Sequence, residues 1–205
     1  MISVDQIVDL HLPQLQRHPR LSQGVRGVLR RLLREQSFRS FAQQYPHLEG
    51  FQFVEQVLEH FAFSTAVRDN ERERIPAHGR VVIIANHPIG SLDGLALLNM
   101  VGGIRRDVKI VANGLLAELA PLKRLLLPVT MMGGRSAARQ LKAIMEHLQG
   151  EGAVIIFPAG EVSRLHPEGV RDGRWNPGFL RLAGQAQAPI VPIHIDGRNS
   201  ALFYG

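Results

Sequence analysis

The sequence contains no cysteine, which excludes disulfide bonds, thiolate zinc sites and an acyl intermediate carried on cysteine. Aromatic residues make up only 6% of the chain, so its core and any pocket must be mainly aliphatic. No apolar run approaches the roughly 20 residues of a spanning helix, and residues 1–10 lack the basic start of a secretory signal. Any membrane contact should therefore be peripheral.

Basic residues exceed acidic ones, which gives a net charge of +6. This balance favours anionic partners: lipid head groups, phosphorylated substrates, an acidic carrier protein or nucleic acid. Signatures of phosphate loops, dinucleotide binding and RNA recognition are absent, so we do not expect a nucleic-acid partner. The nine histidines include no His-Glu-x-x-His pattern, and we predict no metal site.

The 205 residues are enough for one domain and few for two. Residues 1–70 are typical of a helical N-terminal segment. Within it, Arg26, Arg30 and Arg34 form a stripe at helical spacing, with Arg31 beside it. Such a stripe is either a surface for an anionic membrane or a solvated helix face over an ordinary core contact.

After a polar connector, residues 75–205 alternate short apolar runs with helical stretches. We predict buried strands at residues 81–85, 108–112, 153–157 and 190–195, with a weaker strand signal at 126–130 and a helix over 137–148. This alternation predicts an α/β fold with a largely parallel sheet flanked by helices. Ligands on such sheets bind beyond the carboxyl ends of the strands, where two polar clusters follow the predicted strands.

The first cluster, residues 86–94, directly follows the strand VVIIA. Pro88 favours an extended conformation for His87. Ser91 is a plausible N-cap, which would place Asp93 in the first turn of the next helix. A carboxylate near one imidazole nitrogen fixes the tautomer and leaves the other nitrogen as a base. The alternative is an ordinary strand-to-helix turn with an incidental histidine.

The second cluster, residues 157–164, follows another apolar strand and reads Phe-Pro-Ala-Gly-Glu-Val-Ser-Arg. Gly160 lets the backbone approach a ligand closely. Glu161 is suited to orient a polar acceptor, and Arg164 to receive a phosphate or carboxylate. The alternative is a surface loop with an ion pair.

In this order the two clusters resemble the glycerolipid and lysophospholipid acyltransferase superfamily. That superfamily carries Asn-His followed by Asp, then Phe-Pro-x-Gly, then an apolar strand containing proline. The matching residues are Asn86, His87, Asp93, Phe157, Pro158, Gly160 and residues 188–192. The resemblance extends from about Ile75 to the C-terminus.

Two departures from the superfamily pattern point to one bacterial branch, often labelled hemolysin. His87 and Asp93 enclose five residues instead of the usual four, and the block that begins Phe157-Pro158 continues as Ala-Gly-Glu-Val-Ser-Arg in place of Glu-Gly-Thr-Arg. That branch includes enzymes resembling the O-acyltransferases of ornithine and glycine lipid synthesis. The changed block argues against the usual glycerol phosphate acceptor. Members often continue further, so one interpretation of Gly205 is a truncated C-terminus of a single domain, residues 1–205.

The resemblance implies direct transfer of a fatty acyl group from acyl carrier protein or coenzyme A to a hydroxyl of a lyso-lipid, either a lyso-aminolipid or a lysophospholipid. His87 would be the general base and Asp93 its partner. Substrate binding would fall to Asn86, Gly160, Glu161 and Arg164, and no cofactor is needed beyond the thioester co-substrate. The expected location is cytoplasmic, at the anionic inner membrane surface. Amides near Gly90 or Gly160 are candidates for stabilising the oxyanion.

Two other functions remain open from the sequence. A thioesterase or lipid hydrolase would use Ser91, which lies four residues from His87, but the Gly-x-Ser-x-Gly elbow of serine hydrolases is absent. A non-catalytic module that binds membrane lipids is compatible with the basic charge. Acyl transfer by the purified protein would separate an enzyme from such a module.

Overall fold

The structure is a computed structural model that describes residues 41, 44–113, 119–129, 135–167 and 169–197. The chain divides into two compact units, Met1–Leu48 and Glu49–Gly205. Of the first unit the structure describes residues 41 and 44–48, so the arginine stripe at residues 26–34 lies outside the described residues. Both polar clusters and all the predicted strands belong to the second unit.

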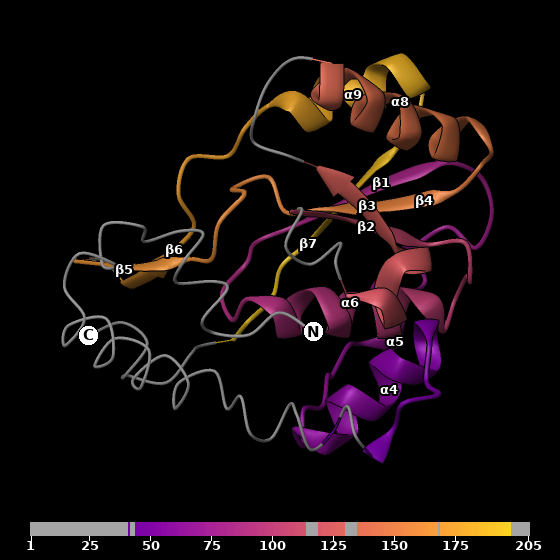
Figure 1. Ribbon diagram of the computed structural model, residues 1–205. Helices are drawn as coiled ribbons and strands as arrows, with labels where there is room; N and C mark the ends of the chain where they lie inside the picture. The colour runs from indigo at the N-terminus through magenta and orange to yellow at the C-terminus, as the bar shows by residue number, and fades with distance from the viewer. Residues whose placement is uncertain (1–40, 42–43, 114–118, 130–134, 168, 198–205) are drawn as a thin grey trace, which may run out of the picture. The chain divides into compact units, whose positions relative to one another are not determined.

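The second unit is built on a five-stranded sheet in the order β3-β2-β4-β1-β7, in which every neighbouring pair is parallel (Figure 1). Its strands are β1 (Val81–Ala85), β2 (Lys109–Asn113), β3 (Leu126–Val129), β4 (Ala153–Ile156) and β7 (Ile190–Ile193). A separate antiparallel hairpin consists of β5 (Arg164–His166) and β6 (Gly169–Arg171). The expected α/β fold with a largely parallel sheet is confirmed.

Helices cover both faces of the sheet. On one face lie α8 (Arg135–Gln149) and α9 (Gly178–Ala186), and on the other lies α6 (Ser91–Gly102), with α4 (Gly50–His60) packed against it (Figure 1). The remaining elements are the short helix α5 (Asp69–Arg72) and the 3₁₀ helix η2 (Ala120–Leu125). The result is a three-layer sandwich, which explains why the strands read as continuous apolar runs instead of alternating ones.

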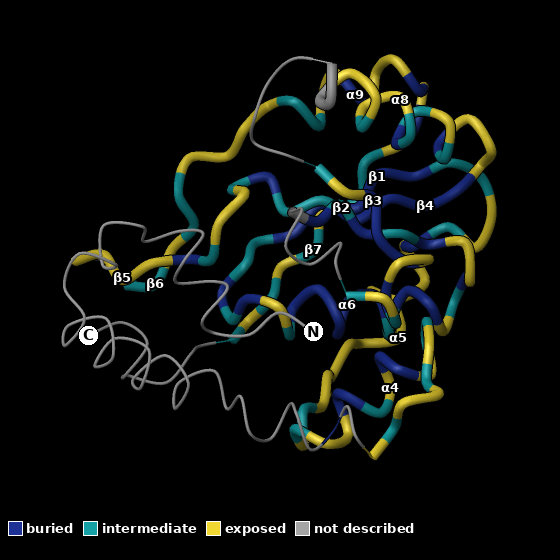
Figure 2. Tube along the Cα trace, in the orientation of Figure 1, coloured by how far each residue is buried: buried dark blue, intermediate teal, exposed yellow. Residues whose placement is uncertain are grey.

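The strand β1 is buried along its whole length (Figure 2). Val82 and Ile84 belong to the core beneath α8 and α9, together with Ile144 and Leu148 of α8 and Leu182 of α9. The alternate residues of the strand face α6, since successive side chains point to opposite faces of a sheet. Burial on both faces therefore fixes the end of β1, from which the first polar cluster emerges.

The connections after β1 and β4 run in opposite directions along the sheet. From β1 the chain passes through α6 to β2, beyond β4. From β4 it passes through α9 to β7, beyond β1, on the other face of the sheet. When two right-handed crossovers run in opposite directions along a sheet, they must lie on opposite faces of it. In such sheets ligands commonly bind beyond the carboxyl ends of neighbouring strands whose connections diverge in this way, and both polar clusters lie at these ends of β1 and β4.

The sequence predicted the sheet more closely than the segments around it. The predicted first strand coincides with β1, and the other predicted strands differ from the observed ones by one or two residues at an end. The helix predicted over residues 137–148 is α8. The hairpin β5–β6 was not predicted, because the three residues of β5 are exposed and no apolar pattern marks the segment.

A buried arginine holds the amino-terminal end of the sheet together. Arg105 is 6% exposed and donates hydrogen bonds to the carbonyl oxygens of Pro76 (3.0 Å), Gly79 (2.7 Å) and Glu151 (2.7 Å). It also forms a bidentate pair with Asp107, with both N–O distances at 2.7 Å. The Arg105 hydrogen bond holds the pKa of Asp107 below its usual value. The loops preceding β1, β2 and β4 are thereby joined, far from the carboxyl ends of the strands.

Replacing this arginine should weaken the fold without altering chemistry at the carboxyl ends of the strands. Arg105→Leu leaves three carbonyls without a partner, so we expect the free energy of unfolding to fall by roughly 3 kcal/mol, measured by urea denaturation. Arg106→Leu is the matched control, because Arg106 is exposed over the Phe51 ring and should contribute only about 0.5–1 kcal/mol. Equal stability of the two variants would contradict the role given to Arg105.

The stability that the Arg105–Asp107 pair supplies should also depend on pH. Because the pKa of Asp107 is lowered on folding, its contribution to the free energy of unfolding should be present above pH about 4 and decline as pH falls further.

Candidate active site

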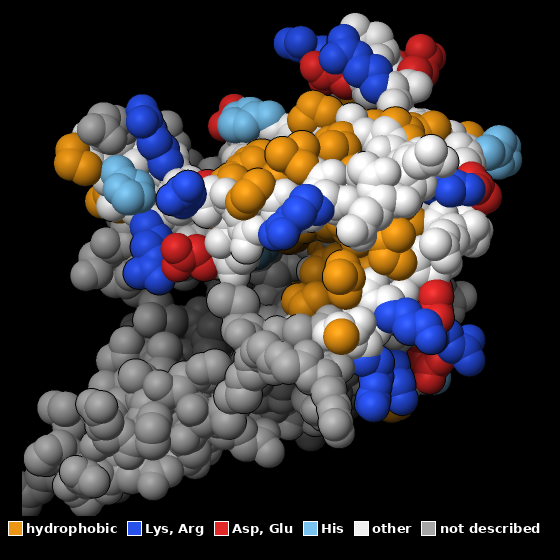
Figure 3. Space-filling view, turned by 90° about the horizontal axis from the view of Figure 1, so that it is seen from above, with side chains coloured by type: hydrophobic (Ala, Val, Ile, Leu, Met, Phe, Trp, Pro, Cys, Tyr) orange, Lys and Arg blue, Asp and Glu red, His pale blue; other side chains and the backbone are white. Residues whose placement is uncertain are grey.

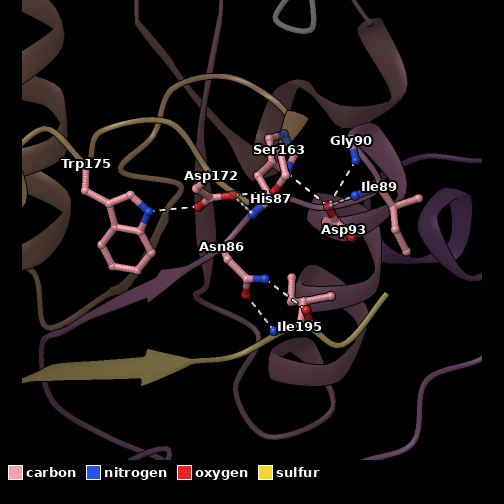
Figure 4. Close-up of polar contacts among 9 residues, drawn as sticks. All are labelled: Asn86, His87, Ile89, Gly90, Asp93, Ser163, Asp172, Trp175 and Ile195. Carbon is pink, nitrogen blue, oxygen red and sulfur yellow. Dashed lines mark hydrogen bonds and ion pairs between the residues drawn. The ribbon is translucent and has the colours of Figure 1, made fainter. Parts of the chain in front are cut away.

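The carboxylate of Asp93 is buried at the start of α6 and receives hydrogen bonds on a single oxygen (Figure 4). Asp93 Oδ2 accepts the backbone N–H of Ile89 at 2.8 Å and that of Gly90 at 3.0 Å, and lies 3.1 Å from Nδ1 of His87. The other oxygen, Oδ1, is buried without a hydrogen-bond partner among the described residues. The histidine and the backbone turn before α6 are therefore held by the same carboxylate oxygen.

The turn that allows this arrangement depends on Gly90. Its φ of 100° and ψ of −135° lie in a region that is essentially restricted to glycine. This conformation directs the amides of Ile89 and Gly90 toward the Asp93 carboxylate. The helix begins at Ser91, so the N-cap is Gly90 and the interpretation of Ser91 as N-cap is wrong. A glycine backbone, with no capping side chain, forms this helix start.

The His87 ring is held by two neighbours. Its Nδ1 faces Asp93, and its ring stacks on Phe157, with centroids 4.0 Å apart and planes at 20°. With a carboxylate at Nδ1, that nitrogen carries the proton in the neutral ring and Nε2 carries the lone pair. Nε2 has no hydrogen-bond partner in the part of the chain that the structure describes, and the His87 side chain is 17% exposed. The ring is therefore arranged to accept a proton from a ligand.

The backbone of His87 is fixed as well. Its N–H donates to Asp172 Oδ1 at 3.1 Å, and its carbonyl accepts the N–H of Ser163 at 2.8 Å. The Ser163 hydroxyl also donates to Asp172 Oδ1, and Trp175 Nε1 donates to Asp172 Oδ2 at 2.8 Å. These contacts, drawn in Figure 4, bring the segment after β4 and the segment after β6 onto the end of β1.

Asn86, expected in substrate binding, is engaged with the backbone after β7. Its Nδ2 donates to the carbonyl of Ile195 at 2.9 Å, and its Oδ1 accepts the N–H of Ile195 at 2.6 Å. This reciprocal pair extends the β1–β7 pairing beyond the strands. In this structure Asn86 therefore holds the end of β1, immediately before His87, against the segment that follows β7.

Glu161 and Arg164 form an ion pair with each other, which is the alternative that the sequence left open for the second cluster. Arg164 donates to Glu161 Oε2 at 2.7 and 3.2 Å, and both side chains are largely exposed. Glu161 Oε1 lies close to Gly173, 2.9 Å from the position that a Cβ on this glycine would take. The pair stands at the base of the hairpin, where Figure 3 shows basic, histidine and apolar side chains gathered at the left of the view.

Amides near Gly90 or Gly160 were predicted as candidates for an oxyanion site, and the amides of these two glycines are already bonded. The N–H of Gly90 donates to Asp93, and that of Gly160 donates to the carbonyl of Phe157 at 3.0 Å in a turn where Gly160 has a φ of 69°. Neither of these two amides can stabilise an oxyanion without breaking its present hydrogen bond.

Comparison with known proteins identifies the family. The chain matches the family described as Acyltransferase over residues 7–205. The chain belongs to this acyltransferase family. It is 29% identical over 205 residues to a lyso-glycine lipid O-acyltransferase of Bacteroides thetaiotaomicron, covering 100% of this chain and 74% of that protein. It is 27% identical over 180 residues to a protein of the same name from Phocaeicola vulgatus, covering 87% and 63%.

The family match and the two curated relatives confirm the resemblance to the acyltransferase superfamily and to its glycine lipid branch. The fold is similar to that of a solved enzyme. The 1-acyl-sn-glycerophosphate acyltransferase of Thermotoga maritima superposes with a TM-score of 0.51 at 20% identity, covering 69% of this chain and 54% of that one. The acyltransferase spans about half of the solved chain and about two thirds to three quarters of the two curated relatives.

The described part of the acyltransferase holds neither a spanning helix nor a metal cluster. None of its helices combines the length and apolar character needed to cross a bilayer. Within the same residues, no group of three or more acidic or histidine side chains is arranged to hold a metal ion.

Sequence reasoning missed Asp172 and Trp175, which complete the site. They lie after β6. Asp172 contacts His87 only once the hairpin is folded back toward β1, and Trp175 contacts Asp172. Two weak signals were available: the Asp-Gly pair at residues 172–173, which is typical of a turn, and the fact that Trp175 is the single tryptophan of the chain.

Replacing Gly90 should damage the site more than the same change elsewhere. Gly90→Ala introduces a side chain at a φ of 100°, at a cost of about 1–3 kcal/mol, and relief of that strain would turn the Gly90 amide away from Asp93. We expect lower thermal stability and lower kcat. Gly184→Ala is the control, because Gly184 is exposed within α9 with open space at its Cβ, and alanine should stabilise the helix there. Wild-type activity in Gly90→Ala would contradict the role given to this turn.

Proposed function

We propose that this acyltransferase moves a fatty acyl group from the thioester of acyl carrier protein or coenzyme A to a hydroxyl of a lyso-lipid, with His87 as general base. The observation that carries this proposal is the buried contact of Asp93 Oδ2 with His87 Nδ1, which leaves Nε2 to face a ligand. The family and the names of both curated relatives support the lipid acceptor. In the proposed reaction, Nε2 takes the proton of the acceptor hydroxyl as its oxygen attacks the thioester carbonyl.

The proton is then given to the departing thiolate, which restores the neutral imidazole and releases the thiol carrier. Between the two steps His87 is an imidazolium, and the buried Asp93 carboxylate 3.1 Å away stabilises that charge. Stacking on Phe157 keeps the ring in one plane throughout. The acyl group passes directly from thioester to acceptor, which agrees with a chain that has no cysteine to carry it.

A hydrolase using Ser91 is the weaker candidate. Ser91 is the first residue of α6 and is exposed, whereas the side chain of the proposed base contacts Asp93. Among the described residues, no hydrogen bond joins Ser91 to His87. Retained transfer by Ser91→Ala would separate the two candidates directly.

We expect the proposed reaction to take place at a lipid surface, because the proposed acceptor is a lipid. The net charge of +6 favours an anionic membrane, and the inner surface of the bacterial membrane is the expected location. The arginine stripe at residues 26, 30, 31 and 34 would contribute to that attraction. Binding to anionic vesicles that weakens as salt rises would support this part of the proposal.

The proposed general base can be tested by comparing changes at His87 and Asp93. His87→Ala should lower kcat by at least about 10²–10⁴-fold with the fold intact, because the proton has no acceptor. Asp93→Asn should be milder. The three donors meet on one oxygen, so the single amide oxygen of asparagine can still receive them while the negative charge is lost. Asp93→Ala, which also removes the acceptor, should be worse than Asp93→Asn.

Transfer of labelled acyl groups to a lyso-lipid panel, with circular dichroism as a check of folding, measures these effects. His60→Ala is a suitable control, since His60 is an exposed residue at the end of α4. Normal turnover by folded His87→Ala protein would refute the proposed mechanism.

Acceptor choice gives a second test of the proposed function. A carboxylate at Glu161 repels a phosphate, but it suits an acceptor with an amino or hydroxyl group, and Arg164 beside it suits the carboxylate of a glycine or ornithine lipid. We therefore expect a higher kcat/KM for a lyso-glycine or lyso-ornithine lipid than for lysophosphatidate. Glu161→Gln should narrow that ratio, whereas Glu55→Gln on the exposed side of α4 should not. Preference for lysophosphatidate, unchanged in Glu161→Gln, would show that this pair does not select the acceptor.

A further inference from the structure

Asp172 accepts hydrogen bonds from three residues, His87, Ser163 and Trp175, of which His87 is distant in the sequence. Its Oδ1 accepts the His87 backbone N–H at 3.1 Å and the Ser163 hydroxyl, and its Oδ2 accepts Trp175 Nε1 at 2.8 Å. All three partners are donors, so the site suits a carboxylate, which only accepts. The carboxylate thus joins the end of β1 and the loop after β4 to the segment after β6.

These contacts act on the backbone of His87, whereas Asp93 and Phe157 act on its ring. The N–H of His87 is held by Asp172, and its carbonyl is held by the N–H of Ser163, a residue that is 2% exposed. Asp172 also bonds the Ser163 side chain, so it supports both sides of the histidine. A shift of His87 along the strand end would have to break these contacts first.

We propose that Asp172 is a positioning residue for His87, and that Trp175 holds the Asp172 carboxylate in the orientation that this task requires. The proposal rests on the proposed role of His87 as the base. Proton transfer depends steeply on the placement of Nε2, and a displacement of about 1 Å can cost on the order of 100-fold in rate. Asp172 touches no reacting atom in this scheme, so its effect falls on kcat more than on the KM of either substrate.

An asparagine at position 172 creates a defined conflict. If its oxygen faces His87 and Ser163, its NH₂ group meets the indole N–H of Trp175, which is also a donor. If the amide turns over, the NH₂ group meets the N–H of His87. One contact is lost in either orientation, and in the second the histidine backbone is released. Replacing Trp175 with phenylalanine removes the donor that opposes the productive orientation.

The first experiment compares Asp172→Asn with Asp69→Asn, a change at an exposed position in α5. We expect kcat to fall on the order of 10- to 100-fold in Asp172→Asn, with a smaller change in KM, and to stay at the wild-type value in the control. Because Trp175 is the single tryptophan, its fluorescence emission should shift in Asp172→Asn and not in Asp69→Asn.

The second experiment separates positioning from general stability. Asp172→Asn combined with Trp175→Phe should recover most of the kcat lost in Asp172→Asn. Asp172→Ala combined with Trp175→Phe should not recover it, because alanine offers no oxygen to the His87 amide. Melting temperatures of the single and double variants show whether recovery follows refolding of a weakened protein.

Several results would overturn the proposal: a normal kcat in Asp172→Asn, failure of Trp175→Phe to recover it, or recovery that only tracks the melting temperature. Equal recovery in the alanine pair would also overturn it. His87→Ala tests the underlying function separately. Loss of transfer in His87→Ala with normal kcat in Asp172→Asn refutes the positioning role alone, whereas full transfer in His87→Ala refutes the proposed base.

Discussion

The candidate site depends on one buried oxygen, Oδ2 of Asp93, which holds the turn before α6 and the ring of His87 together. It receives the amides of Ile89 and Gly90 and faces His87, so the strand end, the turn and the helix start share a single acceptor. Burial of a carboxylate is costly unless donors or opposite charge surround it. Here the backbone N–H groups of Ile89 and Gly90 donate to the carboxylate at the amino-terminal end of α6. The site is consequently assembled by the same contacts that begin the helix.

The sheet topology brings the second cluster to this point. Because β1 and β4 are neighbours, the residues after Ile156 emerge beside those after Ala85, although they are far apart in the sequence. Phe157 then supplies a stacking surface for His87, and Ser163 supplies its backbone amide. The two connections diverge onto opposite faces of the sheet, so the strand order and the handedness of the crossovers bring the ends of β1 and β4 together at one edge, where ligands of such sheets commonly bind.

Local patterns predicted what depends on local geometry. Continuous apolar runs gave β1 and its neighbours, since strands buried on both faces have no alternation. The pairing of His87 with Asp93 was within reach of the sequence because both lie on one strand-to-helix connection. The contact of Asp172 with His87 could not be predicted in this way, because it requires the hairpin to fold back. The strands β5 and β6 have three residues each and lack the apolar pattern that would predict them. Likewise, the contact of Asn86 with Ile195 depends on β7 lying next to β1.

The departure in spacing between His87 and Asp93 is absorbed by the turn and leaves the site itself intact. Five residues separate the pair, yet their facing atoms lie 3.1 Å apart, because Gly90 at a φ of 100° folds the intervening backbone onto the carboxylate. The departure after Phe157 and Pro158 is of a different kind, since Glu161 and Arg164 lie at the surface, and no hydrogen bond in the described structure joins either of them to His87 or Asp93. The same segment holds His87 through two other residues, Phe157 and Ser163. The proposed acceptor contacts at Glu161 and Arg164 can therefore vary while the geometry around the proposed base is kept, because the residues that hold His87 are separate from them.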